Sequence, residues 1–217
     1  MRRLGRLARF RGSLTFMSQP VLNLAILLSG SGRTMVNLAQ SIERGELDAR
    51  IVLVIASRHD AGGIDKARQL GLPVHVVARK EYPTTEDFSD AIWSLVRPAG
   101  VDLVCLAGFL SLLRIPKDFQ VRVLNIHPAL LPRYGGKGMY GHHVHEAVLA
   151  AGEKESGCTV HLCDDEYDRG EILVQRRCPV LPGDTPQTLA ARVFEQECIA
   201  YPQAIRLWQE RNIRQRK

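Results

Sequence analysis

The sequence predicts an α/β fold, Rossmann-like, in which helices cover both faces of a mostly parallel twisted sheet. Two observations carry this prediction. Short, almost continuously apolar runs alternate along the chain with segments whose apolar residues recur at helical spacing. A glycine-containing loop separates the first apolar run from the first helical segment. Because right-handed crossovers place helices on either side of a parallel sheet, this alternation is typical of a sheet buried on both faces.

The first unit of this pattern is a strand, a tight loop and a helix. The strand is the apolar run from Leu22 to Leu28, which breaks at residues 29–32, Ser-Gly-Ser-Gly. The helix that follows carries a set of apolar residues at helical spacing, which are Met35, Leu38, Ala39 and Ile42.

The same unit then recurs. We expect a strand at 51–56 and a helix at 64–70, where Gly71 suits a left-handed C-cap. The next strand is expected at 73–78. The helix expected at 84–96 carries one apolar face, made of Phe88, Ile92, Leu95 and Val96.

The rest of the sheet follows in the second half of the chain. Apolar runs predict strands at 101–106, 121–126, 159–163 and 172–180, and we expect the last two to pair antiparallel. A final helix is expected from 185 to about 210. Since no repeat, low-complexity tract or linker interrupts the pattern, one domain is the interpretation.

Composition and charge bound the class of protein. A chain of 217 residues with 45% hydrophobic and 24% charged residues suits one packed, soluble domain. We expect residues 1–20 to be a basic extension without fixed structure and residues 21–217 to be the domain. Five arginines precede Met17, so the formal charge of +6 falls to +1 in the body of the chain. No nucleic-acid partner is expected, because a basic stripe with interleaved aromatics is missing.

Two further patterns in the sequence bear on the cellular compartment of the protein. No run of eighteen apolar residues occurs, which predicts no transmembrane helix and no membrane partner. The five cysteines are odd in number and form no C-x-x-C pair, which suits reduced thiols in the cytoplasm. The arginine-rich opening is an organelle-targeting segment, a solvated tail or the product of an upstream start, with Met17 as the true beginning in the last case.

The glycine-rich loop after the first strand is a candidate phosphate site. Backbone N–H groups at the start of the following helix would point at an anion. The dinucleotide pattern G-x-G-x-x-G needs a third glycine where this chain has Met35, and no acidic residue ends the second strand. The pattern therefore favours a phosphate monoester over a dinucleotide, although many such loops are glycine-rich for steric reasons alone.

The strand near residue 125 is the candidate catalytic element. Asn125 and His127 are two apart, so both side chains point to one side at the carboxyl edge of the sheet, where open α/β folds bind ligands. An amide donor beside an imidazole suits acyl transfer, because the attacked carbonyl becomes an oxyanion that needs preorganised donors. An isolated pair of this kind is more often structural, and the location favours catalysis here.

An acidic run follows the strand at 159–163. Four carboxylates lie within residues 164–168, which is most often a solvated turn and lacks the glycine-centred pattern of a calcium loop. If Asp168 lies near His127, its charge raises the imidazole pKa above about 6.5 and favours the imidazolium. The histidines at 142, 143 and 145 form no i, i+4 pair and have no cysteine nearby, so no metal site is expected.

With these residues in view, the chain resembles the glycinamide ribonucleotide formyltransferases of purine synthesis, within the folate-dependent formyltransferase superfamily. The resemblance runs from Leu22 to about Trp208. The matching segments are Ser-Gly-Ser-Gly at 29–32, Leu-Ala-Gly-Phe at 106–109, Asn-Ile-His-Pro-Ala-Leu-Leu-Pro at 125–132, Gly-Cys-Thr-Val-His at 157–161, and Asp168 with Gly170.

The resemblance implies a reaction and a role for each candidate residue. It implies that a formyl group passes from 10-formyltetrahydrofolate, the co-substrate, to the amine of glycinamide ribonucleotide, with Asn125, His127 and Asp168 as catalytic residues and no metal. It also implies two sets of binding residues. The ribonucleotide would be held by Gly32, Arg33, Thr34 and Glu197. The folate would be held by Leu110, Ser111, Leu112, Leu113, Asn125, Asp164 and Asp165.

Some positions depart from the family pattern. Relatives commonly have Ser-Asn in place of Arg33 and Thr34, an arginine within the stretch that contains Ser111, and another near Thr85. Arg33, Arg79 and Lys80 are the candidates for supplying the missing charge, and nothing in the sequence chooses among them. The loop at 135–141 is expected to form a mobile flap over the site.

Three alternatives stay open at this point. A formyltetrahydrofolate hydrolase would use the same Asn, His and Asp, but carries a regulatory domain for which residues 1–15 leave no room. A methionyl-tRNA formyltransferase would carry a C-terminal RNA-binding domain, whereas this chain ends shortly after the last expected helix. A non-enzymatic nucleotide-binding protein would require the constellation to be accidental. The sequence does not decide the oligomeric state, and a homodimer is compatible with it.

Overall fold

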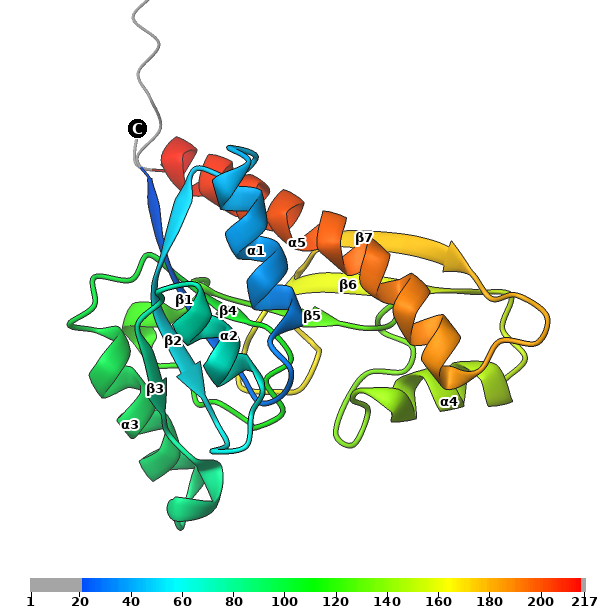
Figure 1. The fold of residues 1–217 in the computed structure, drawn as a ribbon, viewed down its shortest axis with the longest axis horizontal. Coiled ribbons are helices and arrows are strands. Elements are labelled where there is room, and N and C mark those ends of the chain that lie inside the picture. The colour runs from blue at the N-terminus through cyan, green and yellow to red at the C-terminus, as the bar shows by residue number, and fades with distance from the viewer. Residues whose placement is uncertain (1–20, 216–217) are drawn as a thin grey trace, which may run out of the picture.

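The computed structural model describes residues 21–215, so the expected basic extension at 1–20, with Met17, lies outside the described residues. Seven strands form one sheet in the order β3-β2-β1-β4-β5-β6-β7 (Figure 1). The strands are β1 (Leu22–Leu28), β2 (Ala49–Ala56), β3 (Val74–Val76), β4 (Leu103–Leu106), β5 (Val123–His127), β6 (Glu155–Leu162) and β7 (Ile172–Pro179).

The direction of the strands divides the sheet into two parts. The strands β3, β2, β1, β4 and β5 lie in this order, and each pairs in parallel with the next. β6 pairs antiparallel with β5, and β7 pairs antiparallel with β6, which confirms the predicted antiparallel pairing of the last two strands. The strand order reverses between β1 and β4, and this is where open α/β sheets form their ligand crevice.

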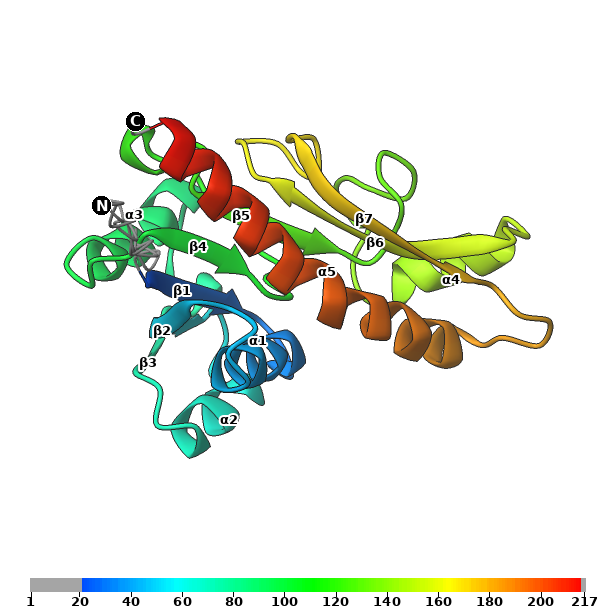
Figure 2. The same ribbon diagram turned by 90° about the horizontal axis from the view of Figure 1, so that it is seen from above.

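Helices cover both faces of the sheet, as predicted. The helices are α1 (Arg33–Glu43), α2 (Gly63–Gln69), α3 (Thr85–Val96), α4 (His142–Ala150) and α5 (Pro186–Gln215), and two short 3-10 helices lie at Arg79–Glu81 and Lys117–Phe119. Along β1, Leu24 and Ile26 pack in the core under α1, α2 and α5, whereas Ala25 and Leu27 pack in the core under α3 (Figure 2). This alternation is the mark of a strand buried on both faces. No helix between residues 21 and 215 is long and apolar enough to cross a membrane.

The structure differs from the sequence-based expectation in the centre of the chain. Helix α4 was not predicted, because its first turn is made of polar histidines and only Val144 and Val148 supply a buried apolar pair. Strand β5 begins at Val123, two residues later than expected. The reason is that Val121 has a left-handed backbone, with φ of 57°, and its carbonyl accepts a hydrogen bond from Trp208. Gly71 has φ of 66°, as a left-handed C-cap requires.

Buried hydroxyl groups connect neighbouring strands of the sheet and the loops that follow them. The Ser29 hydroxyl, just past β1, accepts a hydrogen bond from the Leu110 amide at 2.9 Å and lies 2.6 Å from the Ser57 hydroxyl past β2. The hydroxyl of Tyr201, fully buried on α5, lies 3.0 Å from the carbonyl oxygens of both Leu106 and Leu124. These contacts fix the relative positions of the loops that follow β1, β4 and β5.

The Tyr201 contact leads to a stability prediction. Tyr201→Phe keeps the ring and removes the donor shared by the two strand ends, so we expect the free energy of unfolding to fall by about 1 kcal/mol. Urea denaturation followed by circular dichroism measures this loss. Tyr82→Phe is the control, because its ring packs against Phe88 while its hydroxyl has no hydrogen bond among residues 21–215. Equal stability of Tyr201→Phe and wild type would show that the hydroxyl does not hold the strands.

Candidate active site

Asn125 and His127 lie at the carboxyl end of β5, and both reach the same carboxylate. The Nδ2 atom of Asn125 donates to Oδ1 of Asp168 at 3.3 Å. The Nδ1 atom of His127 lies 3.4 Å from Oδ2 of Asp168, with both side chains almost fully buried. The structure therefore brings together the three residues that the sequence singled out for chemistry.

Asp168 is held in an uncommon backbone conformation. Its φ is 57°, which non-glycine residues adopt rarely and Asp more readily than most. The Gly136 amide donates to Oδ2 of Asp168 at 2.9 Å. Burial raises the pKa of this carboxyl, but His161, the charge of His127 and the Gly136 amide together bring the pKa below its ordinary value. Asp168 is therefore an anion at neutral pH, rather than a member of a solvated acidic turn.

The protonation expected for His127 requires a correction. The charge of Asp168 raises the pKa of His127 as predicted, and so does the Tyr134 carbonyl, 2.7 Å from Nε2. Burial is the larger cause, however, and it brings the pKa below its ordinary value. Because a carbonyl only accepts, Nε2 carries the hydrogen in the neutral ring. A second proton is thus added at Nδ1, facing Asp168.

His161 is a fourth member of the cluster that the sequence reasoning missed. It lies on β6 directly opposite Asn125, and its Nε2 atom is 3.1 Å from Asn125 Nδ2 and 3.5 Å from Asp168 Oδ1. Its Nδ1 atom lies 2.8 Å from the Leu162 carbonyl, so that nitrogen carries a hydrogen. Antiparallel pairing of β5 with β6 was the missing signal, since it alone places this histidine beside Asn125.

Five of the seven residues predicted for the folate line a narrow cavity beside this cluster. Its volume is about 50 Å³. Among the residues that line it are Asn125 and Asp168 of the cluster, and also Ser111, Leu112, Leu113 and Asp164. Leu110 and Asp165 lie outside the lining: Leu110 is 47% exposed, and Asp165 accepts a hydrogen bond from the Ile115 amide.

The predicted phosphate loop is shaped by close backbone contact. Gly32 has φ of 72°, and a Cβ there would lie 2.7 Å from the Cα of Gly63 at the start of α2. No side chain caps α1 and no acidic residue occupies its first turn, so the N–H groups at the start of the helix are free of a side-chain partner. Thr34 is buried, whereas the Arg33 guanidinium stacks on the Phe194 ring at 4.1 Å.

Glu197 is the remaining predicted substrate residue. Burial raises the pKa of Glu197 to about 7, against the opposing charge of Arg33. Glu197 lines neither the cavity at Asp168 nor the cavity beside Arg33. The structure thus brings Glu197 within electrostatic reach of the predicted phosphate loop, but it does not join these residues and the Asn125 cluster in one cavity.

Arg79 is one of the three cations that could replace the arginines found in relatives, and it lies near the predicted folate residues. Its guanidinium lies 3.5 Å from the Thr85 hydroxyl and 2.8 Å from the Tyr82 carbonyl oxygen. It also lies 5.6 Å from the Phe88 ring, which stacks on Phe109 beside the narrow cavity. Arg33 faces Phe194 on another side of the molecule. Position therefore favours Arg79 over Arg33 as a cation near the predicted folate residues.

The histidines of α4 do not gather into a metal-binding group. His143 pairs with Glu146 on the surface, whereas His145 is buried, and burial lowers its pKa to about 4. Within the described residues no group of three or more His, Cys, Asp or Glu side chains could hold a metal ion.

Comparison with known proteins gives a consistent set of relatives. The chain is 34% identical to phosphoribosylglycinamide formyltransferase of Haemophilus influenzae over 193 residues, which cover 88% of this chain and 89% of that protein. The crystal structure of glycinamide ribonucleotide transformylase 1 from Symbiobacterium toebii superposes with a TM-score of 0.83 at 37% identity, covering 91% of each chain.

Some relatives are longer than this chain. It covers 63% of the chloroplastic phosphoribosylglycinamide formyltransferase of Arabidopsis thaliana, at 39% identity over 84% of this chain. It covers only 14% of the trifunctional purine biosynthetic protein adenosine-3 of Drosophila pseudoobscura, at 38% identity over 88% of this chain. The formyl transferase family model matches residues 22–205. The chain therefore belongs to the formyl transferase family.

Proposed function

We propose that the protein transfers the formyl group of 10-formyltetrahydrofolate to the amine of glycinamide ribonucleotide, yielding formylglycinamide ribonucleotide and tetrahydrofolate in purine biosynthesis. The observation that carries the proposal is the convergence of Asn125, His127 and Asp168 at the carboxyl edge of the sheet. The phosphorylated substrate and the reaction are those after which relatives that this chain matches along most of its length are named.

The cluster supports a stepwise transfer. The substrate amine would attack the formyl carbon, and the formyl oxygen would become an oxyanion. Nδ2 of Asn125 would donate a hydrogen bond to this oxyanion in place of one of the acceptors that it contacts in this structure. The amine would lose its proton to neutral His127, and Asp168 would stabilise the imidazolium formed. When the oxyanion collapses, the bond from the formyl carbon to folate N10 would break, and His127 would return the proton to N10.

Binding of the folate would require the narrow cavity to widen. Its volume of about 50 Å³ is far below the roughly 300–1,000 Å³ of typical ligand pockets. The loop at 135–141 is the element proposed to move, because the Gly136 amide links it to Asp168 and several of its glycines have positive φ. In its open form this flap would admit the folate, and in its closed form it would exclude water.

Arg79 is proposed to bind the carboxylate tail of the folate. Its guanidinium is positioned by the Tyr82 carbonyl and the Thr85 hydroxyl, beside aromatic rings that lead to the cavity. Arg79 would thus supply the positive charge that family relatives supply with arginines at other positions.

The reaction is tested by measuring release of tetrahydrofolate with and without glycinamide ribonucleotide. We expect release only with the amine, and a fall in kcat of about a hundredfold in Asp168→Asn with a smaller change in KM, because the anion paired with His127 is lost. Glu171→Gln is the control, since that carboxylate pairs with Arg211 outside the site. Release without the amine would identify a hydrolase, and normal turnover of Asp168→Asn would remove that residue from the chemistry.

The raised pKa of Glu197 predicts a pH-dependent effect on stability. Between pH of about 4.5 and about 7 the folded protein holds this proton while the unfolded chain releases it, so stability falls as pH rises. Glu197→Gln removes the ionisation, so its thermal midpoint should rise relative to wild type from pH 5 to pH 8, while its KM for glycinamide ribonucleotide increases. Glu195→Gln, an exposed neighbour on α5, should show neither change. A constant midpoint difference across this range would contradict the prediction.

The role of Arg79 is tested on the folate side alone. In Arg79→Met we expect the KM for 10-formyltetrahydrofolate to increase about tenfold, as loss of one charge-assisted hydrogen bond implies, with the KM for the ribonucleotide unchanged. Lys80→Met, the exposed neighbour, should leave both constants as in wild type. Equal folate KM in the two variants would assign the tail to another residue.

A further inference from the structure

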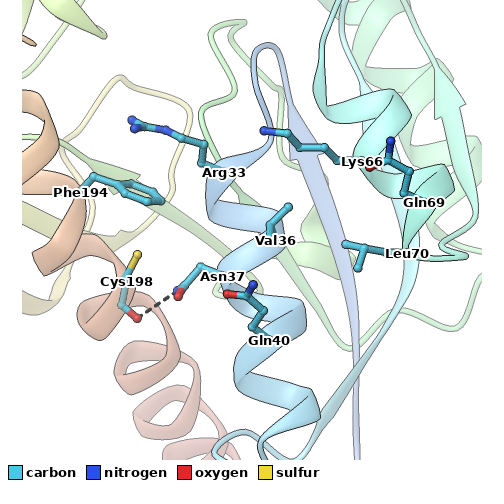
Figure 3. A pocket seen from close by; sticks show the side chains of 9 residues that line it. All are labelled: Arg33, Val36, Asn37, Gln40, Lys66, Gln69, Leu70, Phe194 and Cys198. Carbon is cyan, nitrogen blue, oxygen red and sulfur yellow. Dashed lines mark hydrogen bonds between the residues drawn. The ribbon is translucent and has the colours of Figure 1, made fainter.

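A second cavity lies away from the Asn125 cluster, and we call it the α1 groove. It has a volume of about 440 Å³ and runs along the outer face of α1 between α2 and α5 (Figure 3). Its lining includes Arg33, Val36 and Gln40 from α1, Lys66 from α2, and Phe194 from α5. It shares no lining residue with the narrow cavity at Asp168.

The lining of the α1 groove is positively charged, and Glu197, whose ionisation the charge of Arg33 favours, lies outside this lining. Arg33 and Lys66 are the charged side chains among those that line it, and no carboxylate lines it. Within residues 21–215, neither side chain has a hydrogen bond or an ion pair. Lys66 is half-buried, and Asp65 beside it on α2 pairs with Arg68 instead. A cavity with two unpaired cations favours an anionic occupant.

The geometry of Arg33 suits a phosphate. The Cζ atom of Arg33 lies 4.1 Å from the centroid of the Phe194 ring, a cation–π contact that leaves the N–H groups of the guanidinium available for hydrogen bonds. In Figure 3 the side chains of Arg33 and Lys66 both lie at the end of the groove near the start of α1. Two cations at one end would hold a phosphate that the planar guanidinium binds with two parallel hydrogen bonds.

The rest of the groove suits a flat, partly polar ring. Val36 and the 44% exposed Leu70 supply an apolar floor. Among the described residues, the amides of Gln40 and Gln69 line the cavity without hydrogen-bond partners of their own. Gln40 lies at the end of the groove away from Arg33 and Lys66 (Figure 3). Apolar contact with a few polar groups is the usual make-up of a small-molecule site, and this volume is in the usual range.

We propose that the α1 groove is a second ligand site that binds a nucleoside monophosphate, with the phosphate on Arg33 and Lys66 and the base over Val36 and Leu70 toward Gln40. Arg33 also begins the helix proposed to hold the substrate phosphate. An occupant that engages its guanidinium therefore weakens substrate binding. This effect on turnover rests on the proposed function, whereas the binding does not.

Binding is tested by calorimetry with adenosine 5′-monophosphate, adenosine and inorganic phosphate. We expect one saturable site for the nucleotide, about tenfold weaker in Lys66→Met because a charge-assisted contact is lost, and weaker binding of either fragment alone. Arg68→Met is the matched control, because Arg68 lies on α2 outside the groove and pairs with Asp65. Equal nucleotide affinity in Lys66→Met and wild type overturns the proposal.

The location is tested in the unaltered protein through the thiol of Cys198, which lines the groove. Nucleotide at saturation should slow alkylation of Cys198 by iodoacetamide, mapped by peptide mass spectrometry, and leave alkylation of added glutathione unchanged. Glutathione in the same reaction serves as the reference for the reactivity of the reagent. An unprotected Cys198 with nucleotide bound would place the nucleotide elsewhere and overturn the proposal.

The functional consequence is tested by kinetics. We expect the KM for glycinamide ribonucleotide to increase with nucleotide to a plateau of about fivefold in wild type. In Lys66→Met, whose basal turnover stays normal, half of this increase should need about tenfold more nucleotide. A KM that increases without limit, equally in both proteins, would show competition at the substrate loop alone and would overturn the proposal. Absence of formyl transfer in any condition would overturn the proposed function and leave the binding result standing.

Discussion

The neighbours β1, β4 and β5 run parallel and end at the same edge of the sheet, and this constraint decides where the proposed phosphate loop and the proposed catalytic residues of β5 lie. The loop after β1 contributes Gly32, and β5 contributes Asn125 and His127. The Ser29 hydroxyl connects the loops that follow β1 and β4, and the Tyr201 hydroxyl connects the end of β4 to the backbone of β5. The loop between the antiparallel strands β6 and β7 then places Asp168 beside Asn125 and His127.

The buried cluster balances two opposing electrostatic effects. Burial disfavours the charged form of His127, whereas Asp168 favours it. The outcome is a ring that is neutral until it receives a proton and is paired once it does. Such a ring suits proton transfer in both directions, which a permanently charged imidazolium would not. Burial at a separate position also acts on Glu197, and it raises the pKa of this carboxyl to about 7, near neutral pH.

The sequence predicted the layers of the fold and three of the four residues of the cluster. Apolar runs alone are enough to place β1 and β2, because a strand buried on both faces has little choice of composition. Helix α4 escaped prediction because its first turn is made of histidines, and only Val144 and Val148 among its apolar residues are buried. His161 and the sign of the pKa shift of His127 escaped for another reason: both depend on burial and strand pairing across distant segments, which local patterns do not contain. The stacking of Arg33 on Phe194 is likewise a long-range contact.

The contact between Gly32 and Gly63 has a consequence for how the chain can evolve. A Cβ on Gly32 would collide with the Gly63 backbone, and a Cβ on Gly63 would lie 2.8 Å from the Leu28 side chain and 3.1 Å from Gly32. Neither glycine can be exchanged while the other keeps its place, so the two positions are epistatic. The start of α2 is therefore inherited together with the loop before α1, and a substitution that shifts one of these helices must shift the other as well.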